Sequence, residues 1–457
     1  MRQRVLACIA LSLALASTAA ATGCGSSAAN RGKTVLVAYQ VDAGQDQFGE
    51  LMHKVVPVFE KEHPGWKVQL DPINAQENEY YTKLDLMNKS PSTQPDALVE
   101  DTFLINSDAD AHFLAPLDGY TKSWSDWKDF YPAAKAGVTA TNGHVYGIPL
   151  DTDTRGLWYN KQDFAKAGLP VPWHPKSWAD VLAAARKIKA KVPGVTPMEV
   201  FSGTPAGEAA SMQGFEMLLY GTGESLYDHA TNKWIKPGKG FTSALNFIKT
   251  VYGTGLGPSP QQELNPNIQN EVWQQWLPQN KLAIDLDGSW LSQTWLPSGP
   301  RPWPQWSKTL GWTPMPTETG QGSPLTHGTD TTTLSGGWAF SMGADSQHKQ
   351  MTWDLMKLAL DTQNNTYYTK ITDAVAVRSD VAKQPSYLHE SPDISFWTSL
   401  VKDTNFRPAY SAYPGLSNDI QQATEGVMTG QESPQQAAST YGQALTSAVG
   451  PGSVEGG

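Results

Sequence analysis

The residues with the clearest chemical potential lie between two apolar runs, in the stretch YGIPLDTDTRGLWYNK over 146–161. Asp151, Asp153 and Arg155 form the polar centre of this stretch. Carboxylates and a guanidinium are planar hydrogen-bonding groups that can hold hydroxyls, metals or protons. The change from apolar to polar and back predicts that the chain passes here from one lobe to another. The polar side chains would then line a cleft.

The length and composition of the chain set the class of protein that must position these groups. A chain of 457 residues is too long for one hydrophobic core, because cores stop growing at roughly 250–300 residues, so two lobes are expected. A net charge of -10 argues against a nucleic-acid partner, which needs a basic face. The 17 tryptophans suit large cores or stacking on flat ligands, and we expect packing to account for most of them.

The first residues have the features of an export signal. Arg2 and Arg4 precede the apolar run 5–16, and small residues continue to Gly23, which predicts a signal peptide over 1–23. Cys8 lies inside this segment. The mature chain would therefore keep one cysteine and form no intrachain disulfide.

The remaining cysteine, Cys24, ends a stretch ATGC that resembles a bacterial lipoprotein box, with Ala21 where leucine is usual. The resemblance implies that Cys24 is acylated and becomes the new N-terminus, followed by a polar tether over 24–33. Simple cleavage nearby is the alternative. Fatty-acid labelling of the wild type and of Cys24→Ala separates the two.

The first third of the chain alternates strand and helix patterns. Strands are predicted at 34–40, 66–70 and 96–100, and helices at 50–63 and 80–88, where Pro57 should kink the first helix or move its start. This order predicts a doubly wound α/β lobe. Ligands of such lobes bind beyond the carboxyl ends of the strands, so loops 41–49 and 101–103 should point to one place.

The rest of the chain gives fewer signals. A helix should begin at Ser177, where Ser-x-x-Asp resembles a capping box. Further elements are expected as strands at 281–290 and 311–316, helix-compatible sequence around Phe113 and Leu114, helices at 215–220, 244–252 and 351–360, and a polar tail over 450–457.

Seven blocks in order are similar to the extracytoplasmic solute-binding proteins of carbohydrate ABC importers. They are VFEKEHPGWKV (58–68), QPDALVED (94–101), APLDGY (115–120), YGIPLDTDTRGLWYNKQDFAKAGL (146–169), PKSWADVLAAARKI (175–188), KLAIDLDGSW (281–290) and GGWAFSM (336–342). The stretch NFRPAYSAYPGLSNDIQ (405–421) resembles a subset that binds disaccharides such as trehalose.

The resemblance implies an α/β, two-lobed periplasmic-binding-protein fold of the type II kind, with a three-segment hinge that closes around a sugar. Crossings would lie near 149–155, 284–288 and 336–338. The division expected from these crossings is an N-terminal lobe of 34–149 plus 285–335 and a C-terminal lobe of 150–284 plus 336–450.

The resemblance also implies a set of ligand-binding residues. They are Asp42, Gln45, Asp101, Asp153, Arg155, Asp287, Trp290, Gly336, Gly337, Trp338, Arg407 and Tyr410, with Asp151 and Tyr413 as weaker candidates.

Each of these residues also has a structural explanation. Trp290 can pack in the hinge, Asp42 suits a turn, Asp101 can cap the next helix, Arg155 and Arg407 can serve in ion pairs, and Gly336 and Gly337 can be needed by the backbone.

The same residues are also compatible with other functions. Asp151-x-Asp153 resembles the metal-holding pair of sugar-nucleotide transferases, and paired carboxylates can serve glycoside hydrolysis. Asp108-x-Asp110-x-His112 could hint at a metal but fits an exposed helix face. A surface adhesin or a chemoreceptor-coupled sensor would share the binding fold.

The sequence favours a receptor rather than an enzyme. We expect a monomer without cofactor or metal, lipid-anchored at the extracellular face of a bacterial membrane. It would capture a di- or oligosaccharide and deliver it to an ABC permease.

Overall fold

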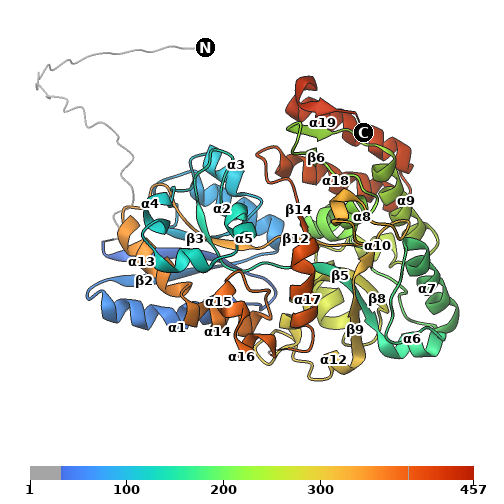
Figure 1. Ribbon diagram of the computed structural model, residues 1–457, viewed down its shortest axis with the longest axis horizontal. Coiled ribbons are helices and arrows are strands. Elements are labelled where there is room, and N and C mark those ends of the chain that lie inside the picture. The colour runs from blue at the N-terminus through green and yellow to red at the C-terminus, as the bar shows by residue number, and fades with distance from the viewer. Residues whose placement is uncertain (1–31, 390, 457) are drawn as a thin grey trace, which may run out of the picture.

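The computed structural model describes residues 32–389 and 391–456 as two α/β lobes (Figure 1). The predicted signal peptide, Cys24 and most of the predicted tether lie outside these residues. Within the described part of the chain, none of the helices combines the length and apolar character that crossing a membrane requires.

The N-terminal lobe is built on a five-stranded sheet with the order β2-β1-β3-β13-β4. β1 (Thr34–Val41) is parallel to β2 (Lys67–Asn74) and β3 (Ala97–Asp101), whereas β13 (Trp338–Met342) is antiparallel to β3 and β4 (Gly147–Pro149). β1 reads as a nearly continuous apolar run because helices cover both faces of the sheet.

Helices from distant parts of the sequence cover the two faces. One face packs on α1 (Gln47–Glu62), α13 (Lys349–Ala359) and α14 (Thr362–Thr372), and the other on α2 (Glu77–Asn88) and α3 (Ile105–Asp110). α1 begins at Gln47 and continues through Pro57 to Glu62. The predicted parallel arrangement of the first three strands is confirmed.

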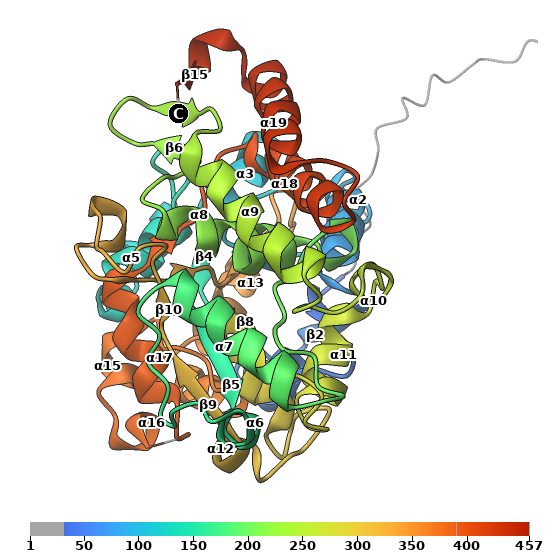
Figure 2. The same ribbon diagram turned by 90° about the vertical axis from the view of Figure 1, so that its right-hand side faces the viewer.

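The C-terminal lobe centres on β5 (Arg155–Asn160), which lies between β8 (Ile284–Gly288) and β9 (Leu310–Thr313), antiparallel to both. Its helices are α6 (Lys161–Ala167), α7 (Trp178–Lys191), α8 (Met217–Gly221), α9 (Lys239–Gly253), α18 (Tyr413–Met428) and α19 (Pro434–Val449), which surround this sheet and the π-helical segment Ala210–Glu216 (Figure 2).

Most of the tryptophans are buried, as expected. The ring of Trp158 is fully buried and contacts four other indoles, those of Trp295, Trp306, Trp312 and Trp397. The Trp158 indole N–H donates to the carbonyl of Gly288 at 3.0 Å. This tryptophan cluster is therefore a core of the C-terminal lobe rather than a ligand surface.

The strand pairing corrects the predicted division into lobes. Residues 285–335 contain β8 and β9, which pair with β5 of the C-terminal lobe, while β13 after residue 336 pairs in the N-terminal sheet. Residues 285–335 were thus assigned to the wrong lobe, and so was the part of 336–450 that holds β13, α13 and α14, whereas α18 and α19 lie in the C-terminal lobe as predicted. A strand pattern shows that a segment is a strand but not which sheet it joins. Asp285 and Asp287 also suggested a polar crossing segment in the sequence, although both are fully buried in the structure.

Three segments cross between the lobes, two of them where predicted. Residues 150–154 join β4 to β5, and residues 336–337 join β12 (Leu334–Ser335) to β13. The predicted crossing at 284–288 is wrong because β8 lies within the C-terminal sheet. The third crossing is instead the stretch after α14, where Val375 forms a β-bridge with Thr152.

The chain then passes along the base of both lobes through α15 (Ser379–Ala382), α16 (Pro385–Leu388) and α17 (Ile394–Leu400). Arg378 pairs with Asp126 of the N-terminal lobe, whereas Trp397 packs on Trp158. This stretch, coloured orange to red in Figure 1, lies between the two lobes.

Several local predictions also need correction. Ser177 precedes α7, but its hydroxyl makes no capping bond, and Asp180 accepts instead from the backbone N–H of Lys176 at 2.9 Å. α3 ends at Asp110, before Phe113 and Leu114. The predicted polar tail contains β15 (Val454–Glu455), which is parallel to β7 (Lys233–Ile235).

Candidate functional site

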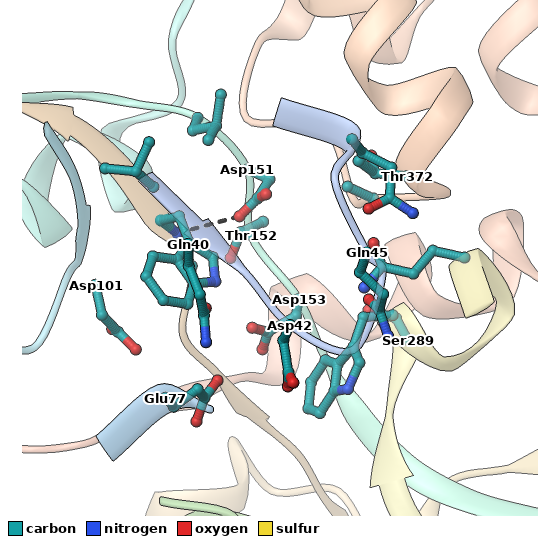
Figure 3. Close-up of a pocket in the computed structure, with 18 of the residues that line it drawn as sticks. Gln40, Asp42, Gln45, Glu77, Asp101, Asp151, Thr152, Asp153, Ser289 and Thr372 are labelled. Atoms are coloured by element: carbon teal, nitrogen blue, oxygen red, sulfur yellow. Dashed lines mark hydrogen bonds between the residues drawn. The ribbon is translucent and has the colours of Figure 1, made fainter. Parts of the chain in front are cut away.

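A cleft lies between the lobes where the first three strands of the N-terminal sheet end. Asp42 follows β1, Glu77 begins α2 directly after β2, and Asp101 is the last residue of β3. All three line the cleft. In Figure 3 the side chains of Asp42, Glu77, Asp101 and Asp153 point toward the same part of it.

The C-terminal lobe supplies the opposite wall. Arg155 comes from the start of β5, Trp290 from the turn after β8, and Arg407 from the loop before α18. The cleft encloses about 1250 Å³, including space open to solvent. Polar and aromatic groups both line its walls, with rings from Tyr39, Phe48, Trp273, Trp290, Trp338 and Tyr368.

The two lobes touch one another around the cleft, so this is a closed arrangement. The amide of Asn270 donates to Asp42 at 3.2 Å, and the amide of Gln45 donates to the Thr294 hydroxyl at 3.3 Å. On another side, Ser411 donates to Asp110.

Arg407 joins the lobes by a buried ion pair. Its Nη2 lies 2.7 Å from Asp101 Oδ1 and its Nη1 lies 2.8 Å from Glu208 Oε2. Its guanidinium carbon lies 4.2 Å from the ring centroid of Phe103. The two carboxylates hold the pKa of Arg407 well above its usual range in spite of burial, so it stays charged.

Arg155 is held by contacts on several sides. It pairs with Asp153 and donates to Gln213 Oε1 and to the carbonyl of Leu334, both at 3.1 Å. Its guanidinium carbon lies 4.7 Å from the ring centroid of Trp290. The sequence left open whether Arg155 forms an ion pair or lines the cleft. In the structure it does both.

Of the two glycines at the 336–337 crossing, Gly337 is the one that the backbone geometry requires. Gly337 has a φ of +136°, and a Cβ there would lie 2.4 Å from the carbonyl oxygen of Asp151. Gly336 donates its N–H to Asp153 Oδ1 at 2.9 Å, which fixes that carboxylate at the hinge. Asp151 is fixed in the same way by the N–H of Trp338 at 3.1 Å.

Burial raises the pKa of three carboxyl groups that line the cleft. Burial, together with the negative charges of Asp101 and Glu208, raises the pKa of Glu77 to about 8. Burial raises the pKa of Asp151 to about 7 and also raises that of Asp42. These groups bind protons more tightly than free carboxyls do.

Most of the predicted site residues lie in the cleft wall. They are Asp42, Gln45, Asp101, Asp153, Arg155, Trp290, Gly337, Trp338 and Arg407, together with the weaker candidate Asp151. Whether each binds ligand stays a prediction.

Three of the predicted residues and the weaker candidate Tyr413 do not line the cleft. Asp287 is fully buried behind it and accepts from the indole N–H of Trp273 at 2.7 Å. Gly336 lies against Arg407 and Asp153, and Tyr410 packs its ring 4.3 Å from that of Tyr227. Tyr413 is fully buried, and its hydroxyl donates to Glu216 at 2.5 Å.

The sequence reasoning missed several lining residues. Glu77 follows the end of β2, so the strand-end rule that found Asp42 and Asp101 would have found it had β2 been extended to Asn74. Glu208, Met212 and Gln213 lie in or beside the π-helical segment, and no sequence pattern marks them.

The DxD and DxDxH motifs show no metal-binding arrangement, since the described residues contain no cluster of three or more acidic, histidine or cysteine side chains placed to hold an ion. Asp153 is neutralised by Arg155 instead. Asp108 lies beside the buried Glu100, and burial raises the pKa of Asp108 to about 6.

Comparison with known proteins gives a consistent family. The model of the family described as bacterial extracellular solute-binding protein matches residues 42–366. A binding protein of Brucella abortus is 22% identical over 392 residues, which are 84% of this chain and 86% of the relative.

Solved structures share the fold. An ABC transporter solute-binding protein from Thermotoga lettingae, bound with alpha-D-tagatose, has a TM-score of 0.76 at 22% identity, covering 91% of this chain and 100% of that one. Maltose-bound MalE3 of T. maritima has a TM-score of 0.73 at 19% identity, with 91% and 100% covered.

Proposed function

Because this chain belongs to the family of bacterial extracellular solute-binding proteins, which serve ABC transporters, we propose that it captures a di- or oligosaccharide and delivers it to a membrane permease. One observation carries the proposal. The cleft wall contains both planar hydrogen-bonding groups and aromatic rings, and contributions come from both lobes. Sugars need hydrogen bonds at their rim and an apolar plate at their C–H face.

The structures of similar proteins support this class of ligand. Chains of this fold have been solved with maltose, cycloalternan and mannobiose, at TM-scores of 0.73, 0.74 and 0.68. We assign sugar binding to Asp153, Arg155 and Trp290, together with the ion-paired Asp101 and Arg407, whose guanidinium lies against Gly336 at the hinge crossing. Their side chains reach the cleft from different lobes, so a ligand that contacts both would favour the closed form.

The family is one of transport proteins, so the enzyme alternatives are set aside. A sensing role would use the same cleft and differ only in the partner that reads closure. We propose that the closed protein acts as a monomer on the permease.

We also propose that Cys24 is acylated and holds the protein at the outer face of the cell membrane. Fatty-acid labelling of the full chain should mark the wild type and leave Cys24→Ala unmarked. Cys8→Ala is the matched control, because Cys8 lies in the predicted signal peptide and its loss should leave labelling intact. Equal labelling of wild type and Cys24→Ala overturns the anchor and leaves sugar capture standing.

Sugar capture is tested by calorimetric titration with a panel of mono-, di- and oligosaccharides. We expect micromolar binding of at least one member and about tenfold weaker binding after Trp290→Ala. Trp303→Ala is the control, since Trp303 packs on Trp295 and does not line the cleft. If Trp290→Ala binds sugar as tightly as the control Trp303→Ala and the wild type, the proposed site is excluded. If no sugar binds to the wild type, the proposed function is excluded.

A further inference from the structure

The cleft carries an excess of negative charge. Its lining residues include six carboxyl groups and only two guanidiniums, namely Asp42, Glu77, Asp101, Asp151, Asp153 and Glu208 against Arg155 and Arg407. Neither lysine nor histidine occurs in this part of the described chain.

Both arginines are already neutralised by protein groups. Arg407 is held between Asp101 and Glu208, and Arg155 is paired with Asp153. An anionic ligand would have to compete with these carboxylates for the same guanidiniums. The cleft is therefore poorly suited to a phosphorylated or acidic sugar.

Asp42, Glu77 and Asp151 remain without a cationic partner. Asp151 accepts from the Trp338 N–H and from the Tyr368 hydroxyl at 3.2 Å, and Asp42 accepts from the Asn270 amide. For Glu77, the described residues provide neither a hydrogen-bond donor nor an ion-pair partner. Its carboxyl group lies at the N-terminus of α2 and points into the cleft beside Asp42 (Figure 3).

The raised pKa of Glu77 is consistent with a carboxyl group that has no cationic partner. Burial and the charges of Asp101, Glu208 and Asp42 raise its pKa to about 8, and Arg407 opposes this shift without cancelling it. With a pKa of about 8, Glu77 holds a proton at neutral pH in these surroundings. A cation placed there would release that proton and form a charge-assisted hydrogen bond.

We propose that the ligand is a sugar carrying a protonated amine, and that Glu77, with Asp42 beside it, binds the ammonium group. This inference rests on the proposed sugar-binding function and names the class of sugar. An ammonium brings three donors and one positive charge to carboxyl groups that have no cationic partner. A hydroxyl at the same position would satisfy one acceptor and leave Glu77 protonated, without the gain of an ion pair.

The test uses ligand pairs that differ only by an amine in place of a hydroxyl. These are glucosamine with glucose, the β-1,4-linked dimer of glucosamine with cellobiose, and 2-amino-trehalose with trehalose, each titrated calorimetrically into the full protein. Glucuronate is the anionic member. In at least one pair the amine should bind about tenfold more tightly, and glucuronate should bind more weakly than glucose.

Two variants assign the preference to its residue. In Glu77→Gln the ratio of amine to neutral affinity should fall close to one. Glu79→Gln is the matched control on the same helix, because Glu79 is exposed and pairs with Lys83, and it should keep the wild-type ratio.

The outcomes separate the inference from the function on which it rests. If sugars bind but the neutral member is equal or better in every pair, or if the amine preference survives Glu77→Gln, the inference is overturned and sugar capture stands. If no sugar of either kind binds, the proposed function fails and this inference fails with it.

Discussion

Arg407 of the C-terminal lobe and Asp101 of the N-terminal lobe form an ion pair of 2.7 Å, with both side chains almost completely buried. The pair joins the last residue of β3 to the loop before α18. It is one of the direct links that hold the two lobes together across the cleft.

Removing the guanidinium should open and weaken the protein. Arg407→Ala leaves Asp101 and Glu208 buried without their partner, and breaking such a pair costs about 3–5 kcal/mol. We expect a matching fall in the free energy of unfolding in urea and a larger radius of gyration by X-ray scattering. Lys402→Ala is the control, since Lys402 is exposed and its loss should cost under about 1 kcal/mol. Equal effects of the two variants would contradict an interlobe role.

A side chain at Gly337 should strain the hinge. Gly337→Ala places a Cβ 2.4 Å from the Asp151 carbonyl at a φ of +136°. We expect a loss of stability of about 1–3 kcal/mol in urea, together with weaker ligand binding, because the Asp151 and Trp338 backbones must move. Gly119→Ala, in α4 (Asp118–Thr121), has open space around it and should be close to neutral. A neutral Gly337→Ala would show that the crossing tolerates this shift.

The tryptophan cluster should dominate the stability of the C-terminal lobe. Trp158→Ala removes a fully buried indole in contact with four others, and we expect a loss of about 3–5 kcal/mol. The measurement is urea unfolding followed by circular dichroism. Trp66→Ala, which alters a partly buried indole of the N-terminal lobe, should cost less than half as much. Comparable losses would mean that the cluster packs loosely.

Stability should fall as the pH rises through neutrality. Burial raises the pKa of Glu263 to about 7 from an ordinary value of 4.5, and burial beside Glu263 and Asp285 raises the pKa of Glu199. The folded protein keeps these protons at pH values where the unfolded chain has released them. The free energy of unfolding therefore declines between about pH 4.5 and 7, by up to about 3 kcal/mol for Glu263.

The check is the slope of urea stability between pH 5 and pH 8. Glu263→Gln should flatten it, because the amide does not titrate, while the exposed Glu62→Gln should leave it unchanged. An unchanged slope in Glu263→Gln would assign the pH dependence to other groups.

Local patterns predicted the first three strands of the N-terminal sheet and the two loops at their ends that carry Asp42 and Asp101. β1 and β3 are apolar runs that end in Asp42 and Asp101, and parallel strands bring such ends together. The same rule missed Glu77, because the polar residues at the end of β2 concealed how far that strand extends.

Pairing between distant segments was beyond the sequence pattern. The run over 281–290 correctly predicted a strand, yet its partner β5 could be identified only in three dimensions. Tyr410 was predicted at the ligand from its neighbour Arg407. Three residues further along an irregular loop, however, the side chain of Tyr410 turns away and packs on Tyr227.

The hinge has a mechanical consequence. Thr152 donates its N–H to the Val375 carbonyl at 3.2 Å and its hydroxyl to the Gly336 carbonyl at 2.9 Å, so three crossing segments lie edge to edge as one ribbon. Such a ribbon bends easily about a single axis and resists shear and twist. Each closing stroke then follows the same arc and returns the two walls to the same register. The geometry of the closed cleft is thus set partly by backbone pairing between segments that are distant in the sequence.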